Sequence, residues 1–410
     1  MIFRKLPLFV ALTAVFAVSL HPAQAQTNGV ISPVGNGING NVSLGVFNPA
    51  DDSDTFTIST AGVMSDGTTS FTGTNVTGSD GTSRWVFDFS NFTLPASDII
   101  TVAANDPKAI TILSKSNLDV EGTINVNGNN ATSGISGVSG GADGGAGGSG
   151  GTTTAAGSNG AGSGGGHGGP AGSTNKVGGG GGGFGGNGGN AGLGTFASGA
   201  AGSGGASYGS TTSPLVNDLQ GGSGGGGGGA STTPGGGGGG GGAIELGAYK
   251  TLTLGAASTI NADGGTGVGK GNNGPSGGGG SGGGILIYGV NVAINSGATL
   301  NAIGGTGGAA TATSSFSAGG SGGGGEIGIY YYFQTTGSGL TENVAGGASS
   351  TGKGNLAGEA GFIGTAISPT YDPQLAIPEP ASYAACFGGL ALLAVVARRR
   401  KGLKTCTASV

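Results

Sequence analysis

The chain has 410 residues, of which 104 are glycine and only 8% are charged, whereas soluble domains carry about 25% charged residues. Its formal net charge is −5. An acidic chain repels phosphate backbones, so charge argues against a nucleic-acid partner. Collagen is excluded because glycine does not recur at every third position. The two cysteines, Cys386 and Cys406, lie near the C-terminus, so we expect no disulfide and no cysteine-based metal site in the body of the chain.

The first 25 residues have the three parts of a secretory signal peptide. Arg4 and Lys5 give a positive start, and the apolar run over 6–20 is shorter than a comfortable membrane span. The small-x-small pattern that signal peptidase needs follows directly. The residues of the predicted cleavage site are Ala23, Ala25 and Gln26. The sequence therefore predicts export, with signal peptidase as a partner.

Residues 26–97 are rich in Thr, Ser and Asn and contain short runs with the strand period of two. Segments 55–58 and 85–89 alternate apolar and polar side chains. Asn-Pro and Asp-Gly turn signals separate such runs. We predict a small all-β lead-in that caps the first exposed strand edge of the domain that follows.

Three short strands recur from residue 98 onward with a period of about 40 residues. Each strand has apolar side chains at i and i+2, as expected for a strand with one buried face. The predicted copies are 110–112, 118–120 and 124–126; 244–246, 252–254 and 260–262; 285–287, 292–294 and 300–302; and a weaker copy from 327–329 to 343–347. We expect the copies to stack as rungs of an all-β, right-handed parallel β-helix, because one rung cannot bury its own apolar side chains.

Long glycine-rich insertions separate these copies. They occupy 129–242, 266–284 and 306–325, and each leaves after a third strand and returns before the next first strand. We therefore expect them to lie side by side. Two interpretations remain open: flexible linkers, favoured by the entropy of glycine, and packed left-handed helices with three residues per turn.

Candidate chemical groups are scattered along the body. Asp119, Glu245 and Asp263 are predicted to point outward from strands, but each stands among neutral residues, and His167 has no acidic neighbour in sequence. Polysaccharide cleavage needs clustered carboxylates. We therefore predict no catalytic residue and no enzymatic activity, with a β-helical carbohydrate-active enzyme (a lyase or glycosidase) as the alternative.

Binding motifs are equally weak. Asp51-Asp52-Ser53-Asp54 crowds carboxylates without the ligand spacing of a calcium loop. No Gly-Lys-[Ser/Thr] follows a glycine-rich loop, which argues against a nucleotide site. Ice binding would require long ranks of threonine on a flat face, and the sequence shows none. We predict no metal, no cofactor and no cofactor-binding residue.

The C-terminal end has three parts in order. They are a Pro-Glu-Pro triplet, an apolar run over 381–397 and a basic cluster. The residues that carry the triplet and the cluster are Pro378, Glu379, Pro380, Arg398, Arg399, Arg400 and Lys401. The run makes about 25 Å of helix, enough to span a membrane. The basic cluster then orients the helix, because Lys and Arg stay on the cytoplasmic side.

This tail resembles the PEP-CTERM sorting signal of Gram-negative bacteria. The resemblance covers residues 377–401. It implies an exosortase-like membrane enzyme as the processing partner, with Pro378, Glu379 and Pro380 as the recognised residues. It also implies an association with exopolysaccharide and biofilm matrix.

Together these features predict an exported structural protein of the cell surface or extracellular matrix, held briefly in the inner membrane and then sorted. The alternative outside enzymology is a surface adhesin that stays anchored by its tail. The predicted organisation is a signal peptide at 1–25, an all-β lead-in at 26–97, first rungs at 98–128, a long insertion at 129–242, repeats with short insertions at 243–376, a sorting signal at 377–401 and a cytoplasmic tail at 402–410.

Overall fold

The computed structural model describes residues 44–50, 53–77, 82–103, 106, 108–132, 134–171, 176–193, 201–209, 215, 219–270, 274–310, 316–336, 339–351 and 365–367. These residues are all-β and contain no α-helix or 3₁₀-helix. They lie within one compact unit spanning 28–372. The strands are β1 (Val46–Phe47), β2 (Thr55–Ile58), β3 (Val63–Ser65), β4 (Ser70–Thr72), β5 (Thr74–Thr77), β6 (Ser83–Phe89), β7 (Asn91–Leu94), β8 (Ile99–Val102), β9 (Ala109–Ser114), β10 (Leu118–Val120), β11 (Thr123–Asn125), β12 (Ala243–Leu254), β13 (Thr259–Asn261), β14 (Gly284–Ile294), β15 (Thr299–Asn301), β16 (Glu326–Thr336), β17 (Thr341–Asn343) and β18 (Thr365–Ile367).

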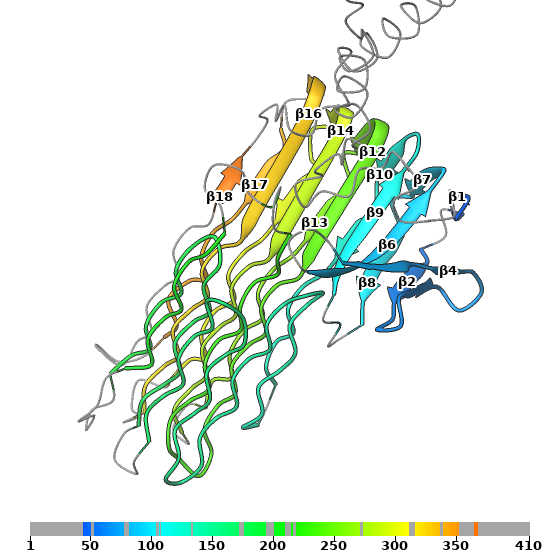
Figure 1. The fold of residues 1–410 in the computed structure, drawn as a ribbon. Coiled ribbons are helices and arrows are strands. Elements are labelled where there is room, and N and C mark those ends of the chain that lie inside the picture. The colour runs from blue at the N-terminus through cyan, green and yellow to red at the C-terminus, as the bar shows by residue number, and fades with distance from the viewer. Residues whose placement is uncertain are drawn as a thin grey trace, which may run out of the picture. The chain divides into compact units, whose positions relative to one another are not determined.

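The strands form two mixed sheets, one of them curled as a half-barrel. Figure 1 shows the long strands β12, β14 and β16 side by side. The 10-stranded sheet has the order β1-β7-β10-β12-β14-β16-β18, with β5, β6 and β9 branching from β12. The 8-stranded sheet has the order β17-β15-β13-β11-β8-β2-β3-β4. Most pairs are parallel, but β2 with β3, β3 with β4 and β5 with β6 are antiparallel. The antiparallel pairs all lie in the N-terminal part of the described chain.

The predicted right-handed parallel β-helix is wrong. Each repeat was expected to contribute three separate strands, whereas the first two run on as one long strand in β12 and again in β14. A register shift between Ala248 and Thr251 takes up the bend that was expected to end the first strand. The three later copies therefore supply two strands each, whereas the first copy supplies β9, β10 and β11. The copies build two sheets, and hairpins at the N-terminal end make both sheets mixed.

The predicted register between copies is confirmed. Ile244 pairs with Ile285, which pairs with Ile327, and Ile260 pairs with Leu300. The copy before the long insertion joins the same ladder, because Ile110 pairs with Ile244. These side chains point to one face and are buried without exposed surface. Burial of this apolar rank stabilises the stack by about 25 cal/mol per Å² of apolar surface removed from water.

Aromatic rings close the N-terminal end of the core. Phe47 stacks on Phe92 with ring centroids 4.6 Å apart and meets Phe56 edge-on at 5.1 Å. Phe89 packs against both Phe47 and Phe92. Such ring pairs contribute about 0.5–1.5 kcal/mol beyond the area they bury.

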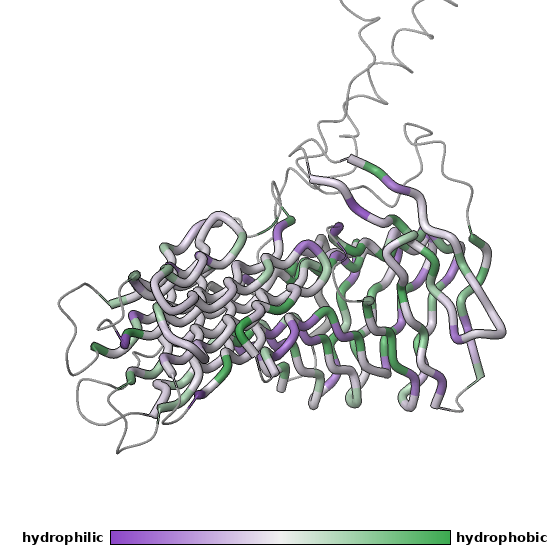
Figure 2. Tube along the Cα trace, turned by 90° about the horizontal axis from the view of Figure 1, so that it is seen from below, coloured by the Kyte–Doolittle hydropathy of each residue, from purple (hydrophilic) through white to green (hydrophobic). Residues whose placement is uncertain are grey.

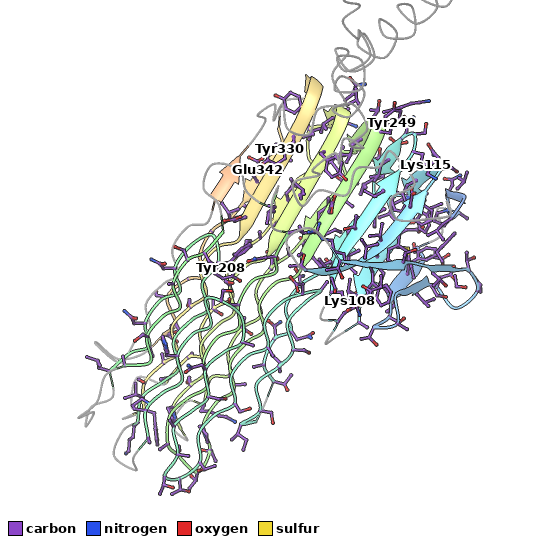
Figure 3. All side chains as sticks on the ribbon, viewed as in Figure 1. Lys108, Lys115, Tyr208, Tyr249, Tyr330 and Glu342 are labelled. Atoms are coloured by element: carbon purple, nitrogen blue, oxygen red, sulfur yellow. The ribbon has the colours of Figure 1, made fainter. Side chains whose placement is uncertain are left out.

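The described glycine segments are packed side by side and not left as linkers. Figure 1 shows them as wavy, closely spaced lines that continue the strands, and Figure 2 shows them as a nearly uniform pale layer of intermediate hydropathy. Few side chains project there, in contrast to the strands (Figure 3). The backbone hydrogen bonds of 235–242 repeat every three residues. Gly235, Gly238 and Gly241 donate to the carbonyls of Pro275, Gly278 and Ser281; Gly237 and Gly240 to those of Gly148 and Gly145; and Gly239 and Gly242 to those of Asn129 and Val126.

A period of three, with every bond leaving the segment, is the signature of the extended glycine helix with three residues per turn. The linker interpretation is therefore wrong for these segments. The segment 221–229 shows how they pack. It donates to 235–242, 157–161 and 177–183, and it accepts from 144–151, 165–171 and 276–283. Each such helix is bonded in several directions around its axis, so the layer is a lattice rather than a set of loops. We call it the glycine lattice.

Glycine is required because the lattice leaves no space for a side chain. A Cβ on Gly225 would lie 2.3 Å from the carbonyl oxygen of Gly278, and one on Gly227 would lie 2.0 Å from that of Ser149. In both cases the obstacle is backbone, which cannot rotate away. Most residues with side chains therefore occupy turns and outer surfaces of the lattice, apart from a few buried ones such as Val177, Ser223 and Ser281. The amide of Ser223 donates to the Ser281 hydroxyl at 2.8 Å.

Candidate functional site

The sequence-predicted processing sites lie outside the described residues. This holds for the signal-peptidase site at Ala23, Ala25 and Gln26, and for the sorting signal at Pro378, Glu379, Pro380, Arg398, Arg399 and Arg400. Within the part of the chain that the structure describes, no helix has the length and apolarity needed to cross a membrane.

The structure places the predicted outward-facing acids apart from one another. Asp119 lies on β10 and is partly exposed, whereas Asp263 follows β13 and accepts a hydrogen bond from the Ile303 amide at 2.8 Å. Burial raises the pKa of Asp263 above its ordinary value. His167 sits in the glycine lattice, where its amide donates to the Ser203 carbonyl. Among the described residues, no group of three or more His, Cys, Asp or Glu side chains could hold a metal ion.

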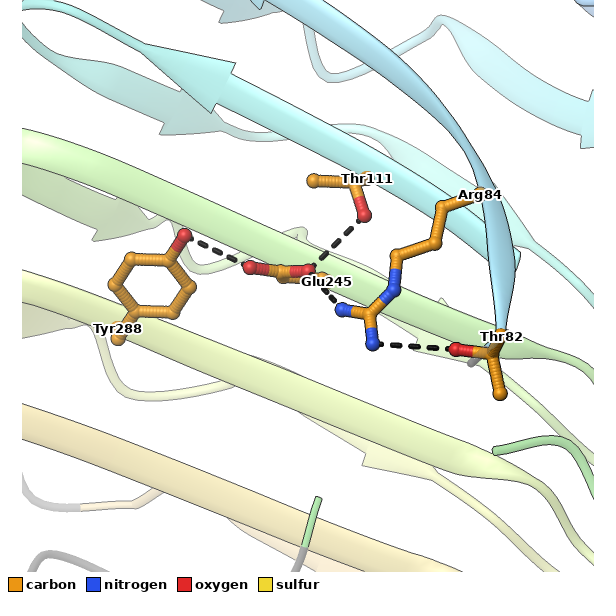
Figure 4. Close-up of polar contacts among 5 residues, drawn as sticks. All are labelled: Thr82, Arg84, Thr111, Glu245 and Tyr288. Carbon is orange, nitrogen blue, oxygen red and sulfur yellow. Dashed lines mark hydrogen bonds and ion pairs between the residues drawn. The ribbon is translucent and has the colours of Figure 1, made fainter. Parts of the chain in front are cut away.

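Glu245 was predicted to be a solvated strand residue, and this is wrong. Its side chain is fully buried and pairs with Arg84, also fully buried, at 3.2 Å between Oε2 and Nη1 (Figure 4). Thr111 donates to the same carboxylate oxygen at 3.0 Å, and Tyr288 donates to the other at 2.8 Å. Thr82 accepts from Arg84 at 3.2 Å. The pair joins β6 of the lead-in to β12, with partners on β9 and β14.

Burial shifts the pKa values of the two acidic side chains in this network, Glu245 and Tyr288. Burial raises the pKa of Glu245, while the charge of Arg84 and the hydrogen bonds from Tyr288 and Thr111 oppose the rise. Burial and the neighbouring Glu245 carboxylate raise the pKa of Tyr288 well above its ordinary value, so its hydroxyl remains a donor. Because the Arg84–Glu245 pair is fully buried, we interpret the network as a cross-link that fixes the lead-in against the repeats and not as a reactive centre.

The long insertion covers this face of the sheet. A Cβ on Gly284 of β14 would lie 2.6 Å from the Gln220 carbonyl and 2.8 Å from a Leu215 methyl. Leu215 and Leu219 are themselves buried. The insertion therefore folds back over the outer side of β14 at Gly284.

The outer face of the 8-stranded sheet carries polar side chains in two parallel columns. In one of these columns, Asn261 donates from Nδ2 to Asn125 Oδ1 at 2.7 Å, and Asn301 donates to Asn261 at 2.8 Å. The pairing register extends this column through Ser70, Ser65, Thr57, Thr101, Asn125, Asn261, Asn301 and Asn343. Every member has a hydroxyl or an amide. We call this column the amide column.

The other column consists mainly of threonines. The register aligns Thr55, Ile99, Thr123, Thr259, Thr299 and Thr341. The structure therefore places four threonines on the neighbouring strands β11, β13, β15 and β17, where no long threonine rank was expected from the sequence. The sequence hides this alignment because the long insertion separates Thr123 from Thr259. The Thr-x-Asn pattern at 123–125, 259–261, 299–301 and 341–343 was the available signal. We call this the threonine column.

No family model, curated protein or solved structure matches the chain.

Proposed function

We propose that the chain is an exported structural protein of the cell surface or extracellular matrix, sorted through its C-terminal tail by an exosortase-like membrane enzyme. The observation that carries this proposal is the tail sequence: Pro378-Glu379-Pro380, then the apolar run over 381–397, then the basic cluster. With the N-terminal export signal, this order holds the body outside the inner membrane. Release of the body then places it with exopolysaccharide.

The glycine lattice supports a structural role. Its cohesion comes from backbone hydrogen bonds between helices, each bonded to several neighbours. Such a lattice needs no disulfide or metal, and its polarity rests on amides rather than on charges. A body of this kind keeps its structure outside the cell across wide changes of salt, because screening acts on charges far more than on buried amides.

The test is the sequence at which the secreted chain ends. We expect mass spectrometry of the protein from the host's culture medium to find a C-terminus near Pro378. The double substitution Pro378→Ala/Glu379→Ala is expected to leave the full tail on the chain and the protein in the membrane fraction. Pro373→Ala, five residues upstream, is the matched control and is expected to be processed normally.

An intact basic cluster on the secreted wild-type chain would contradict sorting. A wild-type chain that stays in the membrane fraction with its tail uncut would instead support the anchored adhesin.

A further inference from the structure

The two columns on the outer face of the 8-stranded sheet form a regular array. Adjacent strands of a sheet lie about 4.7–4.9 Å apart, so the threonine column repeats a hydroxyl and a methyl at this spacing. Alternation along each strand puts the amide column two residues away on the same face. No register shift interrupts the pairs from β11 to β17.

The side chains of the array are held in place before anything binds. Threonine is branched at Cβ and is stiff at χ1. The Thr299 hydroxyl also donates to the Gly297 carbonyl at 3.3 Å. In the amide column, the bonds from Asn261 to Asn125 and from Asn301 to Asn261 fix the amide groups. A surface ordered in this way loses little conformational entropy on binding.

The chemistry of the array limits what it can recognise. Its members at Thr259, Asn261, Thr299 and Asn301 are partly exposed and carry no charge. A charged polymer would find no counter-charge in either column. Neither column contains an aromatic ring on which a sugar could stack. What remains is a neutral partner that offers hydrogen-bond donors and acceptors at a fixed repeat.

We infer that this face binds the surface of ice. An ice surface is an uncharged lattice of hydroxyl donors and acceptors, and it matches a rigid array of hydroxyl, amide and methyl groups better than a mobile polymer does. Water ordered between the columns bridges protein and lattice at low entropic cost, because its partners are already fixed. The inference does not depend on how the chain is sorted.

The test is inhibition of ice recrystallisation by the purified full chain. We expect wild type to keep ice grains small and to produce a gap between melting and freezing temperatures. The double substitution Thr259→Tyr/Thr299→Tyr raises two rings above the centre of the threonine column and is expected to abolish both effects. Thr253→Tyr is the matched control, because Thr253 is also a partly exposed strand threonine but lies on β12 in the other sheet.

Circular dichroism of each variant checks that the fold is retained. Asn261→Gln, which displaces one ladder amide with little change in polarity, provides a second variant and is expected to weaken inhibition. Wild type without any effect on ice would overturn the inference. It would also be overturned if Thr253→Tyr lost activity together with the double variant, or if the folded double variant remained fully active. Retention on an insoluble neutral polysaccharide with no effect on ice would assign the face to a glycan instead.

Discussion

Adding one methyl group inside the glycine lattice tests its packing most directly. Gly305 is buried, and a Cβ there would lie 2.1 Å from the carbonyl oxygen of Gly265. Its amide donates to the Gly280 carbonyl, and its carbonyl accepts from Gly322, both at 2.8 Å. Gly305→Ala must therefore displace backbone on a neighbouring helix.

The expected cost follows from three terms. Overpacking costs about 1–3 kcal/mol, and each hydrogen bond lost adds about 1 kcal/mol. Restricting the unfolded chain returns about 0.4–1 kcal/mol. The unfolding free energy should therefore fall by about 1–4 kcal/mol in total. Thr306→Ala, one residue along the same segment and exposed, should change it by no more than about 0.5 kcal/mol.

Hydrogen exchange read by mass spectrometry is the appropriate assay, because it reports the opening of each glycine segment separately. Gly305→Ala should speed exchange in 276–283, 302–310 and 317–325, while Thr306→Ala leaves it unchanged. If the two variants showed equal protection and equal denaturant midpoints, the close-packing argument would be refuted.

Three further predictions concern side chains. Glu245→Ala should lower the unfolding free energy by about 3–5 kcal/mol because Arg84 stays buried without a carboxylate to neutralise it. Arg84→Met/Glu245→Leu should cost less, about 1–3 kcal/mol, because no buried charge is left unneutralised and only the Tyr288 and Thr111 hydroxyls lose the Glu245 acceptor; urea unfolding distinguishes them, and equal losses would contradict the reasoning. Asn261→Ala should cost about 1–3 kcal/mol by leaving its ladder neighbours unpaired, measured by thermal unfolding, and an unchanged midpoint would argue against the ladder. Because burial raises the pKa of Asp263, its contribution to stability is full below the ordinary carboxyl pKa and is lost as pH rises through the folded pKa. Asp263→Asn, which keeps an acceptor for Ile303, should flatten this fall in urea titrations, and an unchanged slope would contradict it.

The strand register was predictable because the pattern is local. Ile244, Ile285 and Ile327 each open a short apolar alternation at nearly constant spacing, and that spacing decides which residues pair. The number of strands in each repeat was not predictable. Whether the chain breaks or bends between 246 and 252 depends on the register shift after Ala248, and neither propensity nor periodicity distinguishes a bulge from a turn.

The polar columns and the buried ion pair likewise combine features that the sequence shows with features that only the folded chain shows. The Thr-x-Asn motifs are visible in sequence, but their alignment across the long insertion is a tertiary fact. The return of that insertion over β14 near Leu215 is not encoded by any pattern in the glycine-rich sequence. The partnership of Arg84 with Glu245 likewise joins residues from segments with unrelated patterns.

The hydrogen bonding of each glycine helix to several neighbours affects how the protein responds to proteolytic cleavage. The segment 221–229 shares its amides and carbonyls among helices on several sides. A protease that cuts one exposed turn would therefore release neither arm, because each arm remains attached laterally along its whole length. We therefore expect the two fragments of a cleaved chain to stay associated in the folded body.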